Sequence, residues 1–207
     1  MMNTTENPAW APDIIHRGDV LRRSLQNILS GSGCDEAQEH VASLKATQWT
    51  IRTAAQASNA LPGFLEPHLS EALEAAPRTT DDLVSIQNAL GTLLPHLTWM
   101  NRQARAGQDS AFVERHRHAM IAGPGGLFEC STLTLGLALM LPKTCYPYHQ
   151  HPPAEFYLVL SPGEWYREEA GWWSPGPGGL VFNAPSCVHA MRSTNVPLLA
   201  LWGLMHE

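Results

Sequence analysis

The 207-residue sequence has few basic residues and no long apolar run. Its 13 lysines and arginines are outnumbered by 19 acidic residues, and the formal charge is −6. A nucleic-acid partner needs clustered cations that face phosphates, so this composition argues against one, and an anionic membrane surface is disfavoured for the same reason. No stretch approaches the roughly 18 consecutive apolar residues of a membrane helix. The first residues also lack the basic and apolar segments of a signal peptide, so we expect a cytoplasmic protein without a membrane partner.

Cysteine is scarce as well, and its spacing excludes two further classes of protein. The four cysteines, Cys34, Cys130, Cys145 and Cys187, are scattered and form no CxxC pair. A disulfide framework or a thiolate zinc site is therefore not expected. Cys145 and Cys187 fall near candidate metal ligands, but we expect each to be a small buried residue and not a ligand.

The chain changes character near residue 105, and helical signals dominate before that point. Apolar residues recur at helical spacing over residues 13–29, and a capping-box-like start at residue 35 predicts a second helix that runs towards residue 57. Two further helices are predicted, one after Pro62 or Pro67 and one from Thr79–Thr80 to about Pro95. Single histidines occur in these segments and are interpreted as surface or packing residues: His16, His40, His68 and His96.

After residue 105 the sequence consists of short apolar or alternating runs separated by glycine and proline. These runs cover residues 127–140, 155–160, 163–167, 171–173, 180–182 and 196–202. Many short strands at this spacing predict a closed or double-sheet β-barrel. The expected fold is therefore α+β, with an N-terminal helical region over residues 1–105 and a β-barrel over residues 106–207. We expect the helices to cover barrel edges or to form the contact of a homodimer.

The most chemically specific motif lies in the barrel region. It reads His149-Gln-His151-Pro-Pro-Ala-Glu155-Phe-Tyr157, and His189 follows beyond a glycine- and proline-rich stretch. Residues i and i+2 of a strand share one face, so both leading imidazoles can reach one ion, and Glu155 and Tyr157 can share the inward face.

Two features qualify this interpretation of the motif. The Pro152–Pro153 step cannot complete a strand ladder, so a bulge or an edge position is expected there. The alternative is that both histidines are surface residues and that Glu155 is a solvated carboxylate. The carboxylate, the alternating strand and the later histidine together favour a divalent transition metal: zinc, iron, manganese, nickel or cobalt.

A second histidine pair, His116 and His118, lies in the segment Glu114-Arg-His-Arg-His. The flanking arginines oppose metal binding. We therefore interpret this pair as a solvated approach to the first strand of the barrel.

The HxHxxxE pattern, followed by a histidine after Gly-x5-Pro, resembles the two motifs of the cupin fold, a small jelly-roll barrel. The second motif is matched by Gly179, Pro185 and His189. The chain resembles more closely the cupin-type dimethylsulfoniopropionate lyases, which have a helical region before the barrel and a tyrosine two residues past the glutamate. This resemblance implies that His149, His151, Glu155 and His189 are metal ligands, that Tyr157 is the catalytic tyrosine and that Tyr146 is a second pocket tyrosine.

The resemblance implies a β-elimination on a small sulfonium carboxylate. A metal would bind the substrate carboxylate, Tyr157 would remove the adjacent proton as general base, and dimethyl sulfide and acrylate would leave. Aromatic faces would bind the sulfonium, and the candidates are Tyr146, Tyr148, Trp165, Tyr166, Trp172, Trp173, Phe182 and Trp202. Two alternatives stay open: an iron-dependent metal-cupin dioxygenase, and a cupin that binds a small molecule without catalysis. The tyrosine at position 157 favours the lyase, since neither alternative needs it.

Overall fold

The computed structural model describes residues 9–46, 48–52, 59–108 and 110–206. The N-terminal part contains four longer helices: α1 (Ala11–Gly31), α2 (Asp35–Ala46), α3 (Glu66–Glu74) and α4 (Asp81–Leu93). Short helical turns occur at Gly63–Leu65, Leu94–His96 and Ala111–Glu114, the last labelled α5. Among the residues that the structure describes, no helix is both long enough and apolar enough to cross a membrane.

The helices begin where the local sequence predicts. Thr80 is the N-cap of α4, and its hydroxyl accepts a hydrogen bond from the Leu83 backbone N–H at 3.3 Å. Asp81 and Asp82 occupy the first turn of this helix, where negative charge is favourable beside unpaired N–H groups.

The prediction that the second helix runs towards residue 57 was wrong for the residues that can be described. This helix ends at Ala46, and Thr50–Ile51 form strand β1, paired with β4 (Phe128–Glu129). Trp49 and Ile51 are buried in the core. Residues 53–57 of the predicted helix lie outside the described residues. The β-branched Thr50 and Ile51 gain a pairing partner far along the chain, which local periodicity does not report.

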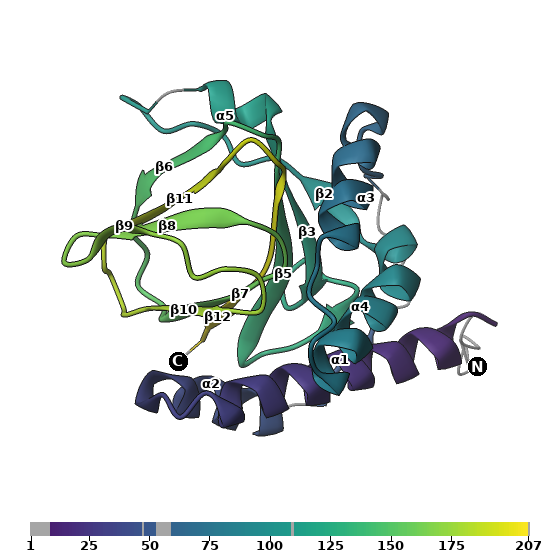
Figure 1. Cartoon of the computed structure of the whole chain (residues 1–207). Helices are drawn as coiled ribbons and strands as arrows, with labels where there is room; N and C mark the ends of the chain where they lie inside the picture. Colours follow the sequence, from purple (N-terminus) through teal and green to yellow (C-terminus); the bar gives the residue numbers. More distant parts are fainter. Residues whose placement is uncertain (1–8, 47, 53–58, 109, 207) are drawn as a thin grey trace.

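The remaining strands form two sheets (Figure 1). Besides β1 and β4, the eight-stranded sheet contains β2 (Thr98–Met100), β3 (His116–Ala122), β5 (Leu133–Met140), β7 (Glu155–Val159), β10 (Leu180–Asn183) and β12 (Leu198–Met205). The four-stranded sheet contains β6 (Cys145–His149), β8 (Gly163–Arg167), β9 (Gly171–Trp173) and β11 (His189–Ser193). Pairing within the sheets is antiparallel apart from the contact between β3 and β4.

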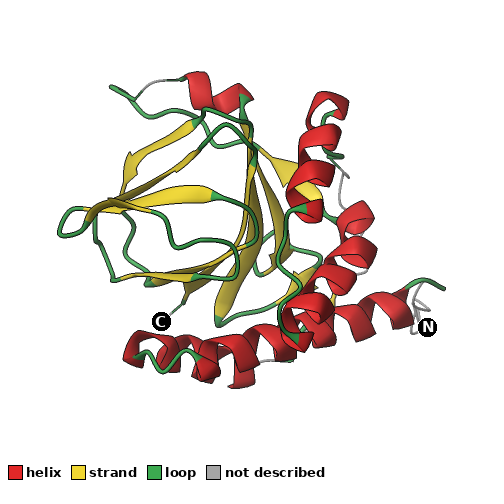
Figure 2. Cartoon of the chain, viewed as in Figure 1, coloured by secondary structure: helices red, strands yellow, loops and turns green. Residues whose placement is uncertain are grey.

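The larger sheet is buried on both faces, which explains its long apolar strands. One face packs against α1, α2 and α4 in a core that includes Phe156, Leu158, Leu199 and Leu201. The residues between these positions, such as Tyr157, Val159 and Ala200, belong to a second core inside the barrel. Helices α1 to α4 lie together on the outer side of the larger sheet, and the smaller sheet closes the barrel opposite them (Figure 2). The chain thus has the expected α+β class, a helical region followed by a barrel built from two sheets.

The chain crosses between the two sheets inside the histidine motif. Strand β6 ends at His149 in the smaller sheet, and β7 begins at Glu155 in the larger one. The expected irregularity at Pro152–Pro153 is therefore a loop, and His151 lies in that loop and not on a strand. As expected, Glu155 and Tyr157 face the barrel interior while Phe156 packs against the helices.

Candidate metal centre and pocket

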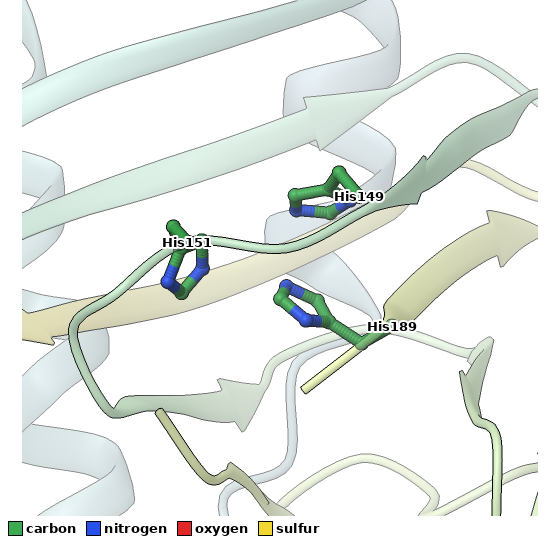
Figure 3. A group of neighbouring side chains, drawn as sticks. All are labelled: His149, His151 and His189. Carbon is green, nitrogen blue, oxygen red and sulfur yellow. The ribbon is translucent and has the colours of Figure 1, made fainter. Parts of the chain in front are cut away.

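Three imidazoles from two strands and a loop converge inside the barrel (Figure 3). His149 ends β6 and is the cross-strand partner of His189, which begins β11. Their ring centroids lie 4.1 Å apart, and the His151 ring lies 4.9 Å from that of His189. One ring nitrogen from each histidine lies within 4.8 Å of the others. The three side chains can therefore reach a single ion.

Backbone carbonyls fix the protonation pattern of these three rings. In each ring Nδ1 lies 2.9 Å from a carbonyl oxygen, that of Pro147 for His149, Pro153 for His151 and Cys187 for His189. A carbonyl oxygen only accepts, so each Nδ1 carries the hydrogen and donates it. Each neutral ring therefore has its lone pair on Nε2, which is the arrangement found in metal-binding histidines.

Glu155 adds a carboxylate to the same cluster. Its Oε2 lies 3.0 Å from Nε2 of His189 and 3.4 Å from Nε2 of His151. Burial opposes ionisation of this carboxyl, but His151 and His189, when protonated, donate from Nε2 to it, and their hydrogen bonds and positive charge lower its pKa below the usual range. Asn183, opposite Glu155 in the β7–β10 pair, donates a hydrogen bond from Nδ2 to Oε2 at 2.9 Å. Glu155 is thus held as an ionised carboxylate.

The cluster fits a divalent cation. Nε2 of His151 and Nε2 of His189 are buried and have no hydrogen-bond donor among the described residues. When both rings are neutral, their lone pairs face the Glu155 carboxylate oxygen, so positive charge is needed there, either as protons on Nε2 or as a bound cation. Three imidazole nitrogens and one carboxylate oxygen are a common ligand set for first-row transition metals. Burial followed by repulsion from His189 lowers the pKa of His149 to about 3, which keeps this ring neutral and able to act as a ligand.

A cavity of about 310 Å³ adjoins the cluster, between the two sheets. Its polar lining includes Arg102, His118, Tyr146 and Tyr157, together with His149, His151 and Glu155. Its apolar lining is formed by Met100, Met120, Met191, Trp202 and Leu204. The space suits a small molecule that has both a polar and an apolar part.

Both predicted tyrosines line this cavity. Tyr157 lies on β7, on the same face as Glu155, and burial followed by the Glu155 charge raises its pKa well above the usual value. Tyr146 lies on β6, and its hydroxyl oxygen accepts a hydrogen bond from Nη1 of Arg102 at 2.7 Å. Burial raises the pKa of Tyr146, and this hydrogen bond opposes the increase.

The interpretation of His116 and His118 as solvated residues was wrong. His116 is fully buried, and His118 lines the cavity. Both belong to β3, where His116, His118 and Met120 alternate onto the inner face, while the intervening Ala119 packs towards the helices. Burial lowers the pKa of His118 to about 4, so this ring is neutral near pH 7.

The sequence model of the dimethylsulfoniopropionate lyase family matches residues 36–200. The chain belongs to this family. Dimethylsulfoniopropionate lyase DddQ of Ruegeria pomeroyi is 33% identical over 99 residues, which are 47% of this chain and 48% of the relative. The alignment therefore spans about half the length of that curated relative.

Solved structures of this lyase family share the fold over nearly the whole chain. The crystal structure of DMSP lyase DddQ from Ruegeria pomeroyi DSS-3 superposes with a TM-score of 0.61 at 25% identity, covering 89% of this chain and 92% of that one. A chain from the crystal structures of the DMSP lyases RdDddP and RnDddQII gives a TM-score of 0.66 at 22% identity, covering 92% and 93%. At that identity the second likeness shows the fold alone.

The eight aromatic residues proposed to bind a sulfonium differ in whether they line the cavity. Only Tyr146 and Trp202 of that set are among the residues that line the cavity. Tyr148, Tyr166 and Trp172 contact one another in a partly exposed cluster, with Tyr148 50% exposed. The others pack elsewhere: Trp165 contacts Tyr157, Phe182 stacks on His40, and Trp173 lies beneath Arg167.

Two details of this family member were not anticipated from the sequence. Arg102 reaches the cavity from the segment after β2, although no motif singles it out. Cys145, expected to be buried, is exposed. It is the neighbour of the inward-facing Tyr146 on β6, so alternation turns its side chain outward.

Proposed function

We propose that this protein is a metal-dependent carbon–sulfur lyase that cleaves dimethylsulfoniopropionate to dimethyl sulfide and acrylate. In this proposal His149, His151, Glu155 and His189 hold the metal, and residues 106–207 supply the metal-binding strands of the barrel. Residues 1–105 supply the covering helices, strands β1 and β2, and part of the cavity lining. The observation that carries the proposal is the convergence of three Nε2 lone pairs and one carboxylate beside a cavity lined by two tyrosines. The family match over residues 36–200 supports the choice of substrate.

The reaction is a β-elimination with Tyr157 as the base. The Tyr157 phenolate oxygen takes the proton from the carbon beside the carboxylate, and the electrons of that C–H bond form the new C=C bond. The C–S bond then breaks, and its electron pair leaves on sulfur as neutral dimethyl sulfide, so no acid is required. When bound at this site, a divalent cation supplies positive charge that polarises the substrate carboxylate and favours the phenolate.

That positive charge is needed because the protein alone keeps Tyr157 neutral. Burial and the Glu155 carboxylate both raise the pKa of the phenol. Tyr146 has a different task in this proposal. Because Arg102 donates to the Tyr146 oxygen, the hydroxyl hydrogen of Tyr146 is free to be donated towards the substrate.

Headspace analysis under anaerobic conditions tests the proposal. Purified protein loaded with zinc, iron, manganese, nickel or cobalt is incubated with dimethylsulfoniopropionate, and dimethyl sulfide and acrylate are measured. We expect both products in equal amounts, loss of activity after chelation, and recovery when metal is returned. Tyr157→Phe should keep its metal content and lose turnover.

Other outcomes identify the alternatives. A strict need for iron(II) and oxygen uptake would indicate a dioxygenase. Tight binding of the substrate without either product would indicate a binding protein. Retained turnover in Tyr157→Phe would remove this residue as the base.

A further inference from the structure

Arg102 places a cation on one wall of the cavity without a carboxylate partner. Its Nη1 donates to the Tyr146 oxygen at 2.7 Å, and its guanidinium carbon lies 5.3 Å from the centroid of the same ring. Over the part of the chain that the structure describes, Arg102 takes part in none of the ion pairs. A guanidinium has five N–H donors, so donors remain for a ligand.

The positive charge of Arg102 acts electrostatically on other groups that line the cavity. After burial, it is one of the causes that lower the pKa of His118, on β3. The guanidinium therefore acts as a source of positive potential over the cavity in addition to contacting one phenol.

Another part of the cavity lining is apolar and aromatic. Trp202 and Met120 line the cavity from the larger sheet, and both are cross-strand partners of Gly136 on β5. A Cβ atom at Gly136 would lie 2.5 Å from Cζ2 of Trp202, so this glycine makes room for the indole. Of the two proposed sulfonium-binding rings that line the cavity, Tyr146 already has the Arg102 cation over it. Trp202 is the ring left for a ligand cation.

We propose that Arg102 determines which way the substrate lies in the cavity, by attracting its carboxylate end and repelling its sulfonium end towards Trp202. The ligand class that follows is a small zwitterion with a carboxylate at one end and an onium group at the other. This inference rests on the proposed function for the identity of the substrate. It predicts that the replacement of Arg102 changes the affinity of the cavity for an anion and for a cation in opposite directions.

Two probes separate these responses without turnover: propionate, which has only the carboxylate, and trimethylsulfonium, which has only the onium group. Their dissociation constants are measured by calorimetry or ligand-observed NMR for the wild type and for Arg102→Met, with and without zinc. We expect the variant to bind propionate at least about tenfold more weakly, because a charge-assisted hydrogen bond is lost. It should bind trimethylsulfonium about two- to fivefold more tightly, because one partly exposed like charge is removed.

Two further variants serve as controls. Arg105→Met removes the same charge from the exposed Arg105 of the same segment, outside the residues that line the cavity, and should change neither constant by more than about twofold. Arg102→Lys keeps the charge and should keep both constants closer to the wild type than Arg102→Met does. Equal weakening of both probes in Arg102→Met, or no change in either, overturns the proposal.

The same measurements distinguish this inference from the lyase activity. If wild-type protein forms no dimethyl sulfide while the two probes respond in opposite directions, the lyase proposal fails and the orienting role of Arg102 stands. If dimethyl sulfide forms but Arg102→Met binds both probes as the wild type does, the orienting role fails and the lyase proposal stands.

Discussion

Replacing Asn183 with alanine should weaken metal binding with little change in the three imidazoles. Asn183 and Glu155 are 2% and 4% exposed, and the amide of Asn183 donates to the carboxylate oxygen that faces His151 and His189. A hydrogen bond to a charged group contributes about 1.5–3 kcal/mol, and its loss also frees the carboxylate to rotate. This corresponds to a roughly 10- to 150-fold decrease in metal affinity, which agrees with the effect of outer-shell substitutions at other metal sites.

Competition against a chromophoric chelator measures this affinity directly, without substrate. The matched control is Asn88→Ala, at an exposed position of α4 far along the chain from the cluster, which should leave zinc affinity unchanged. Zinc affinity within threefold of the wild type in Asn183→Ala, together with a lowered melting temperature, would show that Asn183 only packs the strand pair. The reasoning about Glu155 would then be refuted.

Three further predictions concern stability. Burial lowers the pKa of His40 to about 4; the unfolded chain therefore binds the extra proton as pH falls from 6.5 towards 4, and stability is lost in that window. Between pH 7.5 and pH 5, His40→Leu should reduce the loss of unfolding free energy by up to about 2 kcal/mol in urea titrations, and the exposed-site control His16→Leu should not. Gly136→Ala should lower the unfolding free energy by about 1–3 kcal/mol in the same assay, because its Cβ would collide with the Trp202 indole. Gly91→Ala, with open space around it, should leave the unfolding free energy unchanged or raise it. Equal effects of the two substitutions would contradict the packing argument. Thr80→Ala should lower the unfolding free energy by about 1 kcal/mol through loss of the α4 cap, and an unchanged value would mean that water replaces the hydroxyl.

The local patterns of the sequence were sufficient to predict most elements of the fold. Helices α1 and α4 follow apolar periodicity and a threonine cap, and the barrel strands follow short runs between glycines and prolines. Strand β1 was missed because its partner is β4, more than seventy residues later, and no local signal reports that pairing. Tertiary pairing decided the conformation of Thr50 and Ile51 against the helical interpretation.

The residues of the candidate site were likewise predicted only where a local sequence pattern places them. The spacing of the motif predicted that Glu155 and Tyr157 share a face, and both line the cavity. Arg102 could not be found in this way, because its position depends on how the segment after β2 folds over β6. His118 was misinterpreted because the charge of its sequence neighbours was given more weight than strand alternation, which turns it inward.

The double burial of the larger sheet has a consequence for protein engineering. Shortened versions of this protein that retain only the barrel would present leucines such as Leu137, Leu139 and Leu201 to water, since α1 and α4 would no longer shield them. Such a hydrophobic surface favours aggregation. Design of a smaller protein on this scaffold would have to replace the helix-facing residues of β5, β7 and β12 with polar ones and leave the intervening residues, which face the barrel interior, unchanged.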